Sequence, residues 1–218
     1  MAYKIWSKSS TTPLPTLITH TFSDDDAGLW TACQRIGCPN FHLICLYDID
    51  LDAALTPWPA EGVRKGQPPF AGTADVHLAY LLQKLLPEVE SQLSSPTSYY
   101  ALVGYSLAGL FALWASTQTA VFQRIACASA SFWYPNFVEY LEKNRWSIPP
   151  QCVYLSLGDK ESQTRHPLMR QIDERTERIF QLLQQCGIPT IKASNPGNHF
   201  TEPHVRLAKG ILWILSQD

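Results

Sequence analysis

The segment LVGYSLAGLF, at residues 102–111, constrains the fold more than any other part of the chain. An apolar run typical of a buried strand leads into Gly-Tyr-Ser-Leu-Ala, and an apolar stretch of helical length follows. A serine on a sharp turn between strand and helix needs small residues two positions before and after it, because those positions pack together. Gly104 and Ala108 fit this requirement, with alanine where glycine is usual. The context predicts that Ser106 is a nucleophile at the end of a sheet; an ordinary glycine-containing turn is the alternative.

Short apolar runs alternate with helical stretches along the rest of the chain, apart from an irregular, proline-rich segment at 48–72. This alternation predicts an α/β fold with a mostly parallel sheet and helices on both faces. The 218 residues fit one domain, 1–218, without a dividing linker. Strands are expected at 3–7, 14–22, 41–47, 99–103, 124–130, 152–157 and 189–193, and helices at 28–36, 73–93, 107–117, 168–185 and 201–216. Pro87 is expected to kink or split the helix at 73–93, and Thr201 to cap the last helix.

A serine nucleophile needs a neighbouring base, and the chain has six histidines. Hydrolases with this turn place nucleophile, acid and histidine in that order along the chain. His199 satisfies the order, because it lies in the loop Asn-Pro-Gly-Asn-His-Phe between the last predicted strand and the last predicted helix. His204 is the alternative base, although the first turn of a helix would hold its ring away from the sheet edge. His166 is predicted to be a surface residue, and His20 a structural one.

The acid is expected after the strand at 152–157, where the sequence continues Gly-Asp-Lys-Glu. Glu161 lies three residues after the glycine, as the acid does in many hydrolases, and Asp159 is the alternative. The acid would hold the imidazole tautomer and stabilise the imidazolium formed during the reaction. A solvated charge on a turn is the simpler interpretation of either residue.

Acyl transfer also needs hydrogen-bond donors aimed at the developing oxyanion. The backbone N–H of Leu107, directly after the nucleophile, is expected to be one donor. The second is expected from the backbone of Phe22 or Ser23, although the usual His-Gly signature is missing there. Aromatic residues near the same edge of the sheet are expected either to contact substrate or to pack structurally. The candidates for substrate contact are Tyr105, Trp58 and Trp133.

Charge and cysteine usage argue against several other classes of function. Seventeen basic and nineteen acidic residues give a net charge of −2 and are scattered, so neither a nucleic-acid nor a membrane surface is expected. No apolar run has the length of a membrane span, and the N-terminus lacks the apolar core of a signal peptide, so a cytoplasmic location is expected. Cys33 and Cys38 are the only close pair of cysteines, which favours reduced thiols over a zinc site or a disulfide.

Several segments together resemble the putative esterase family of α/β hydrolases, which includes the esterase D-like and enterochelin-esterase-like proteins. They are GYSLAGLFALWA (104–115), SASFWYPNF (129–137), LSLGDKE (155–161), PGNHF (196–200), LTPWPAEG (55–62) and PPFAGTADVHLAYLLQKLLP (68–87). The resemblance covers most of residues 14–215 and implies the α/β-hydrolase fold and a Ser-acid-His hydrolase without metal or organic cofactor. It implies that Ser106 is the nucleophile and His199 the base, and it leaves the identity of the acid undecided. Neither the accessory domain nor the sizeable cap of larger relatives is expected within these 218 residues.

Hydrolysis of a small-molecule carboxylic ester through an acyl-serine is therefore the leading hypothesis. The same residues would also serve an acyltransferase, a thioesterase or a peptidase, and the sequence does not separate these. A hydrolase-like binding protein with a degenerate triad is the non-enzymatic alternative, and it predicts that neither Glu161 nor Asp159 reaches His199. The sequence carries no signal for the oligomeric state.

Overall fold

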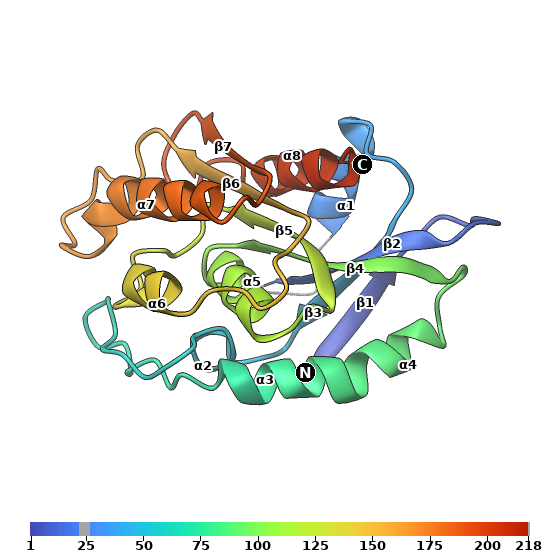
Figure 1. The fold of residues 1–218 in the computed structure, drawn as a ribbon, viewed down its shortest axis with the longest axis horizontal. Helices are drawn as coiled ribbons and strands as arrows, with labels where there is room; N and C mark the ends of the chain where they lie inside the picture. Colours follow the sequence, from blue (N-terminus) through green and yellow to red (C-terminus); the bar gives the residue numbers. More distant parts are fainter. Residues whose placement is uncertain (22–26, 218) are drawn as a thin grey trace.

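A seven-stranded sheet forms the centre of the computed structural model, which describes residues 1–21 and 27–217 (Figure 1). The strands are β1 Ala2–Trp6, β2 Leu14–His20, β3 His42–Tyr47, β4 Thr97–Tyr105, β5 Phe122–Ala128, β6 Cys152–Gly158 and β7 Thr190–Asn195. They lie in the order β1-β3-β2-β4-β5-β6-β7; β1 is antiparallel to β3, and the other neighbours are parallel. The predicted α/β class is confirmed, and each predicted strand is present.

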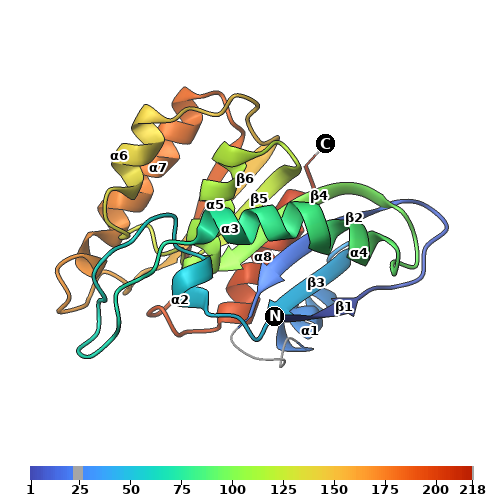
Figure 2. The same cartoon turned by 90° about the horizontal axis from the view of Figure 1, so that it is seen from below.

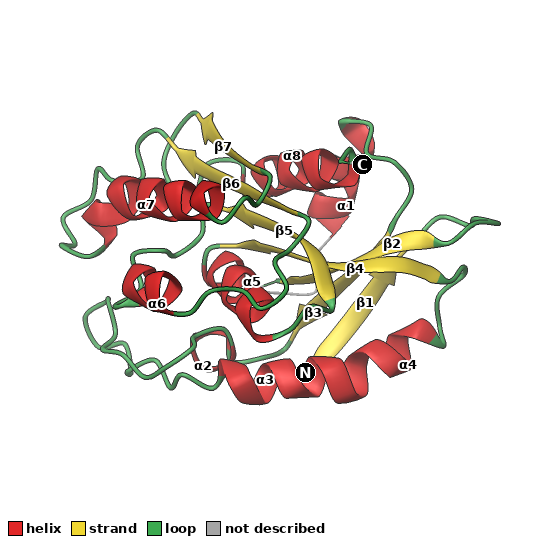
Figure 3. Ribbon diagram, viewed as in Figure 1, coloured by secondary structure: helices red, strands yellow, loops and turns green. Residues whose placement is uncertain are grey.

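Helices cover both faces of this sheet. They are α1 Ala27–Arg35, α2 Leu51–Ala54, α3 Ala74–Tyr80, α4 Leu86–Glu90, α5 Leu107–Gln118, α6 Phe137–Lys143, α7 Ile172–Gln185 and α8 Pro203–Leu215. Figure 2 shows α3, α5, α6 and α7 in front of the sheet, whereas α1 and α8 lie together on the other face (Figure 3). The short helices α2 and α6 were not predicted. Among the described residues, no helix is long and apolar enough to cross a membrane.

The central strands are mostly apolar and mostly buried because both of their faces are covered. Successive side chains of a strand point to opposite faces. Ile18 of β2 and Leu102 of β4 therefore pack in the core under α5, while Leu17 and Val103 pack in the core under α8. This double burial is why the strands read as continuous apolar runs and not as alternating patterns.

The connections from β2 and β4 leave in opposite directions, although the two strands are neighbours. The chain continues from β2 to β3 on one side and from β4 to β5 on the other. In open parallel sheets, ligands bind outside the carboxyl ends of the strands at such a switch point. Ser106 follows β4 directly, so the topology places it at this position.

Pro87 lies where the predicted helix at 73–93 divides. The helix consists of α3, a π-helical turn at Leu81–Leu85, and α4. The N–H of Leu86 donates to the carbonyl of Leu81, five residues back. Proline has no N–H to donate, so the regular α-helical pattern cannot continue through it.

The predicted cap at Thr201 is wrong, because the last helix begins two residues later, at Pro203. Proline is well suited to the first turn of a helix, since its N–H would have no partner there. Glu202 precedes it with a φ of 48°, and its side chain makes no capping hydrogen bond. The Thr201 hydroxyl is used within the preceding loop, where it accepts the N–H of Asn198 at 3.2 Å.

Candidate active site

The turn after β4 holds Ser106 in a strained backbone conformation, with a φ of 57° and a ψ of −123°. Residues other than glycine rarely adopt a positive φ, so the surrounding hydrogen bonds must hold it there. The Ser106 N–H donates to the Ala128 carbonyl at 3.3 Å, and the Ser106 carbonyl accepts the N–H groups of Ser131 at 3.0 Å and Leu110 at 3.2 Å. These bonds tie the turn to β5 and α5 and leave the serine half-buried at the carboxyl end of β4.

Gly104 and Ala108 pack against each other, as the sequence predicts. A Cβ on Gly104 would lie 2.2 Å from the carbonyl carbon of Ala108 and 2.3 Å from its carbonyl oxygen. Contacts this short with backbone atoms cannot be relieved by rotating a side chain. The turn therefore admits a methyl group at residue 108 and excludes one at residue 104.

Gly104→Ala is accordingly expected to lower the free energy of unfolding by about 3 kcal/mol, because the collision overpacks the turn. Activity should fall as well, since the shifted turn carries Ser106. Gly187→Ala is the matched control: Gly187 has a φ of 71°, and a Cβ there would meet nothing within 4 Å. Its cost is backbone strain alone, about 1 kcal/mol. Denaturant unfolding measures both losses, and equal losses would show that packing does not require glycine at residue 104.

The loop after β7 brings His199 to the serine. Its Nε2 lies 3.1 Å from Ser106 Oγ. The Tyr105 hydroxyl donates to the His199 carbonyl at 2.6 Å, which fixes the main chain of this loop. Tyr105 was predicted to contact substrate, and the structure gives its hydroxyl this positioning contact. The His199 side chain is 31% exposed, so a molecule from solvent can approach the ring.

Of the two candidate acids, Glu161 lies against the imidazole. Its Oε2 is 2.8 Å from His199 Nδ1. The Asp159 carboxylate instead accepts the Gly197 N–H at 2.8 Å, and so it supports the turn before His199. Ser106, His199 and Glu161 thus form a continuous chain of hydrogen bonds.

The Glu161 carboxyl is only 4% exposed, and its pKa lies below the usual value. Burial alone would raise this pKa, but hydrogen bonds from His199, Ser129 and the Gly158 N–H outweigh that effect. Oε1 accepts the Ser129 hydroxyl at 2.7 Å and the Gly158 N–H at 2.6 Å. The carboxylate is therefore ionised at neutral pH, with Oε2 facing the imidazole.

Two residues beside this chain were not identified from the sequence. The Arg206 side chain is 2% exposed, and its Nη1 lies 2.9 Å from Glu161 Oε1. The Ser131 hydroxyl, just after β5, lies 3.2 Å from Ser106 Oγ. The available signal for Arg206 was its position next to Leu207 and four residues before Gly210, on the buried face of α8.

The backbone N–H of Leu107, the expected oxyanion donor, lies at the start of α5, and its role stays a prediction. Leu107 is the first residue of α5, and the first N–H groups of a helix have no acceptor within the helix. The positive end of the helix dipole also favours negative charge at this point. Phe22 and Ser23, the expected source of the second donor, lie outside the described residues.

The aromatic residues proposed to contact substrate have packing partners within the protein. The Trp58 indole donates its N–H to the Pro135 carbonyl at 3.0 Å and packs on the Tyr140 ring. Trp133 is 8% exposed and packs on Phe70. These contacts agree with the structural alternative, and a contribution of Trp58 or Trp133 to binding stays a prediction.

His20, His77 and His204 lie in different surroundings from His199. His20 and His77 form a buried pair with their Nε2 atoms 2.8 Å apart, and both rings pack on Phe111. Burial lowers the pKa of His77 to about 4, and it also holds the pKa of His20 well below the usual value. Both are thus neutral at pH 7, as expected of a structural pair. The ring of His204 lies against Gly28 of α1, on the face of the sheet opposite α5.

All six cysteines are free, including the close pair Cys33 and Cys38. Five of them are buried, and Cys186 is partly exposed. Over residues 1–21 and 27–217, no three His, Cys, Asp or Glu side chains gather as metal ligands would.

A sequence profile of the family described as "Putative esterase" matches residues 39–199 of this chain. The chain belongs to this esterase family. The match spans β3 to His199 and includes the Ser106 turn and the Glu161 loop. This is the family that the sequence motifs resemble.

A curated relative has a similar sequence. The uncharacterized protein YbbA of Bacillus subtilis (strain 168) is 24% identical over 162 residues, which make up 73% of this chain and 65% of the relative. The match thus spans less than two thirds of the length of that relative.

Solved structures share the fold. An IroE-like serine hydrolase from Shewanella oneidensis aligns with a TM-score of 0.82 at 17% identity, over 97% of this chain and 74% of that one. The siderophore hydrolase EstA from Aspergillus nidulans aligns with a TM-score of 0.72 at 18% identity, over 98% of this chain and 94% of that one. These likenesses show the α/β-hydrolase type of fold that the sequence predicted.

Proposed function

We propose that this esterase cleaves a small-molecule carboxylic ester through an acyl-serine intermediate on Ser106. The continuous contact from Ser106 Oγ to His199 Nε2 at 3.1 Å, and from His199 Nδ1 to Glu161 at 2.8 Å, carries the proposal. A nucleophile, a base and an orienting acid in that geometry are what serine hydrolases use. A degenerate binding protein would have no carboxylate within reach of His199, and the Glu161 contact argues against that alternative.

The reaction has two halves. Ser106 Oγ attacks the ester carbonyl while His199 Nε2 takes the hydroxyl proton, and the Leu107 N–H stabilises the oxyanion. The intermediate then breaks its bond to the alcohol, which leaves with the proton from Nε2, and the acyl group stays on Ser106. In the second half, His199 takes a proton from water, the resulting nucleophile attacks the acyl-serine, and the carboxylic acid leaves as Ser106 regains its proton.

Exposure at the site favours water as the acyl acceptor. His199 is 31% exposed, and the next residue, Phe200, is 81% exposed. Enzymes that protect an acyl intermediate from hydrolysis exclude water from it. The proposed reaction is therefore hydrolysis, with transfer to another acceptor as the second candidate.

The substrate is proposed as a class and not as a single compound. EstA is described as a siderophore hydrolase. Its TM-score of 0.72 at 18% identity supports a common fold, so a siderophore is one small-molecule substrate to include in a test of this class.

Labelling with a fluorophosphonate probe tests the proposal, because the probe phosphonylates an activated serine. We expect one label on the folded protein, mapped to Ser106 by mass spectrometry, and a burst of p-nitrophenol on mixing with p-nitrophenyl acetate. Heat-unfolded protein is the control and should not be labelled, because its serine has no base. Folded protein that carries no label at Ser106 would contradict the proposed mechanism.

A further inference from the structure

We propose that Arg206 is a positioning residue, whose buried guanidinium joins the loop of Glu161 to the loop of His199. The charge keeps the Glu161 carboxylate ionised and turned toward the imidazole throughout the reaction. This inference deepens the proposed function and rests on it, because it concerns the same triad.

The contacts of Arg206 connect both loops. Its Nη1 lies 2.9 Å from Glu161 Oε1 and 3.1 Å from the Ser129 hydroxyl. Its Nη2 donates to the Pro196 carbonyl at 2.7 Å, three residues before His199. One rigid planar group thus fixes the distance between the acid and the chain that carries the base.

The two oxygens of Glu161 have separate tasks. Oε1 accepts Arg206, Ser129 and the Gly158 N–H, whereas Oε2 accepts His199. Anchoring one oxygen prevents rotation of the carboxylate away from the ring. A buried carboxylate also needs a counter-charge, because burial without one would favour the neutral acid. The imidazole supplies positive charge only when protonated, while the guanidinium supplies it at every stage.

Gly158 provides the space for the guanidinium. A Cβ at Gly158 would lie 2.8 Å from both Nη1 and Nη2 of Arg206, and 2.3 Å from the Gly197 carbonyl oxygen. The absence of a side chain at Gly158 therefore leaves room for both the arginine and the loop that carries His199. A long charged side chain only 2% exposed and enclosed in this way is a built part of the site.

The role predicts a change in pH dependence, which general destabilisation would not produce. Other groups that titrate near the triad are Tyr105, whose hydroxyl lies 3.4 Å from Arg206, and Asp159, which binds the Gly197 N–H. Burial raises the pKa of Tyr105 above its usual value, so this hydroxyl stays neutral in the acid range of the test. Loss of the guanidinium charge should make protonation of the His199–Glu161 pair easier, and the acid limb of kcat/KM should move upward.

The test compares Arg206→Gln and Arg206→Lys with the wild type in p-nitrophenyl acetate hydrolysis across pH. For Arg206→Gln we expect the acid limb of kcat/KM to move up by about one pH unit. Arg206→Lys keeps the charge, so its limb should stay in place while kcat falls, because an ammonium lacks the fork that reaches both loops. If Arg206→Gln fails to fold, Arg206→Met, which keeps the bulk of the stem, takes its place.

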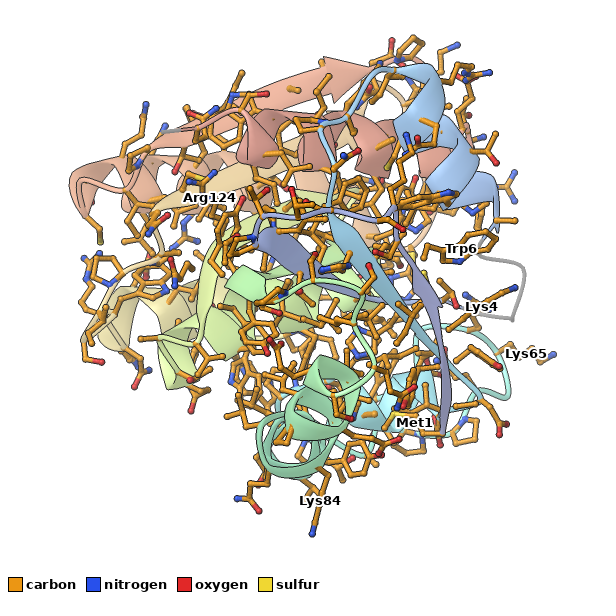
Figure 4. All side chains as sticks on the ribbon, turned by 90° about the vertical axis from the view of Figure 1, so that its right-hand side faces the viewer. Met1, Lys4, Trp6, Lys65, Lys84 and Arg124 are labelled. Atoms are coloured by element: carbon orange, nitrogen blue, oxygen red, sulfur yellow. The ribbon has the colours of Figure 1, made fainter. Side chains whose placement is uncertain are left out.

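Arg124→Gln is the matched control. Arg124, which Figure 4 labels, is also buried. It lies near the start of β5, whereas Ser106 follows the carboxyl end of the parallel neighbour β4. Its guanidinium donates to the carbonyls of Ile214 at 2.7 Å and Gln217 at 2.8 Å. Its loss should lower the melting temperature without moving the acid limb. A folded Arg206→Gln protein with an unmoved limb would overturn the proposal, as would a limb that moves equally in Arg206→Lys.

A measurement that does not depend on enzymatic turnover tests the role of Arg206 separately from the proposed ester hydrolysis. The midpoint of the His199 ring titration, followed by NMR, should move upward in Arg206→Gln and not in Arg124→Gln. An inactive wild type with this shift would reject the proposed ester hydrolysis and keep the assignment of Arg206. An active wild type whose Arg206→Gln variant lacks the shift would keep the proposed ester hydrolysis and reject the assignment of Arg206.

Discussion

Ser106→Ala is expected to reduce kcat/KM for p-nitrophenyl acetate by about 10⁴-fold or more. Without Oγ no acyl-enzyme can form, and only the oxyanion donor and substrate binding remain to accelerate attack by water. Steady-state kinetics measure the loss, and the burst of p-nitrophenol should disappear. Circular dichroism should show that the variant keeps the fold, because only a half-buried hydroxyl is removed.

Ser131→Ala is the matched control for that variant. It removes a hydroxyl 3.2 Å from Ser106 Oγ, so it changes the surroundings of the nucleophile without removing it. Loss of one neutral hydrogen bond is expected to cost about tenfold at most. Equal activity of Ser106→Ala and the wild type would reject Ser106 as the nucleophile. If Ser131→Ala loses as much activity as Ser106→Ala, the reaction requires the Ser131 hydroxyl as well, and Ser106 is not shown to be the nucleophile.

Glu161→Gln is expected to lower kcat by about 10³-fold, while KM changes little. The amide has nearly the same shape, but it has no negative charge to stabilise the imidazolium that forms as Ser106 attacks. It can also donate an N–H to His199 Nδ1, which would favour the wrong tautomer. The pKa of Glu161 lies below its usual range, so the wild-type carboxylate stays ionised at the pH of the assay.

Asp159→Asn provides the comparison, because the sequence alone left the two acids as alternatives. Asp159 accepts a backbone N–H at Gly197, and an asparagine oxygen can do the same. We expect a loss of about tenfold at most, since a single hydrogen bond is weakened. Kinetics of both variants across pH 5 to 9 settle the assignment. A larger loss in Asp159→Asn than in Glu161→Gln would show that the acid has been assigned to the wrong residue.

The positions of Ser106 and His199 at one edge of the sheet were predictable from a local motif and from the order of elements along the chain. The turn needs small residues next to the serine, and Gly104 shows why: its position has no space for a methyl group. His199 follows from chain order and from its loop between the last strand and the last helix. Neither prediction required knowledge of a distant contact.

The sequence could not decide in the same way whether Glu161 or Asp159 contacts His199. Both residues lie in one tight loop, and a rotation of a few bonds decides which carboxylate faces the ring. The structure shows that the Gly158 N–H and the Ser129 hydroxyl hold Glu161, and Ser129 comes from the end of a different strand. Spacing along the chain does not predict which residues at the ends of β5 and β6 contact each other.

Arg206 was missed for a related reason. A charged residue in a helix is usually solvated, and complete burial of arginine occurs when partners surround it. Those partners come from four other segments, so no window of sequence contains them. The prediction of a cap at Thr201 failed for the opposite reason. The local sequence is typical of a cap, but the helix begins at Pro203.

The proposed site is assembled from segments that are far apart in the chain, and these segments are synthesised at different times. β4, α5 and β5 leave the ribosome before β7 and α8, so the Ser106 turn is made first. Until α8 inserts its guanidinium, Glu161 has neither this cation nor a fixed imidazole beside it. If the proposed mechanism holds, a growing chain without β7 and α8 carries the serine without its base, and we expect it to be inert toward esters until both elements have docked.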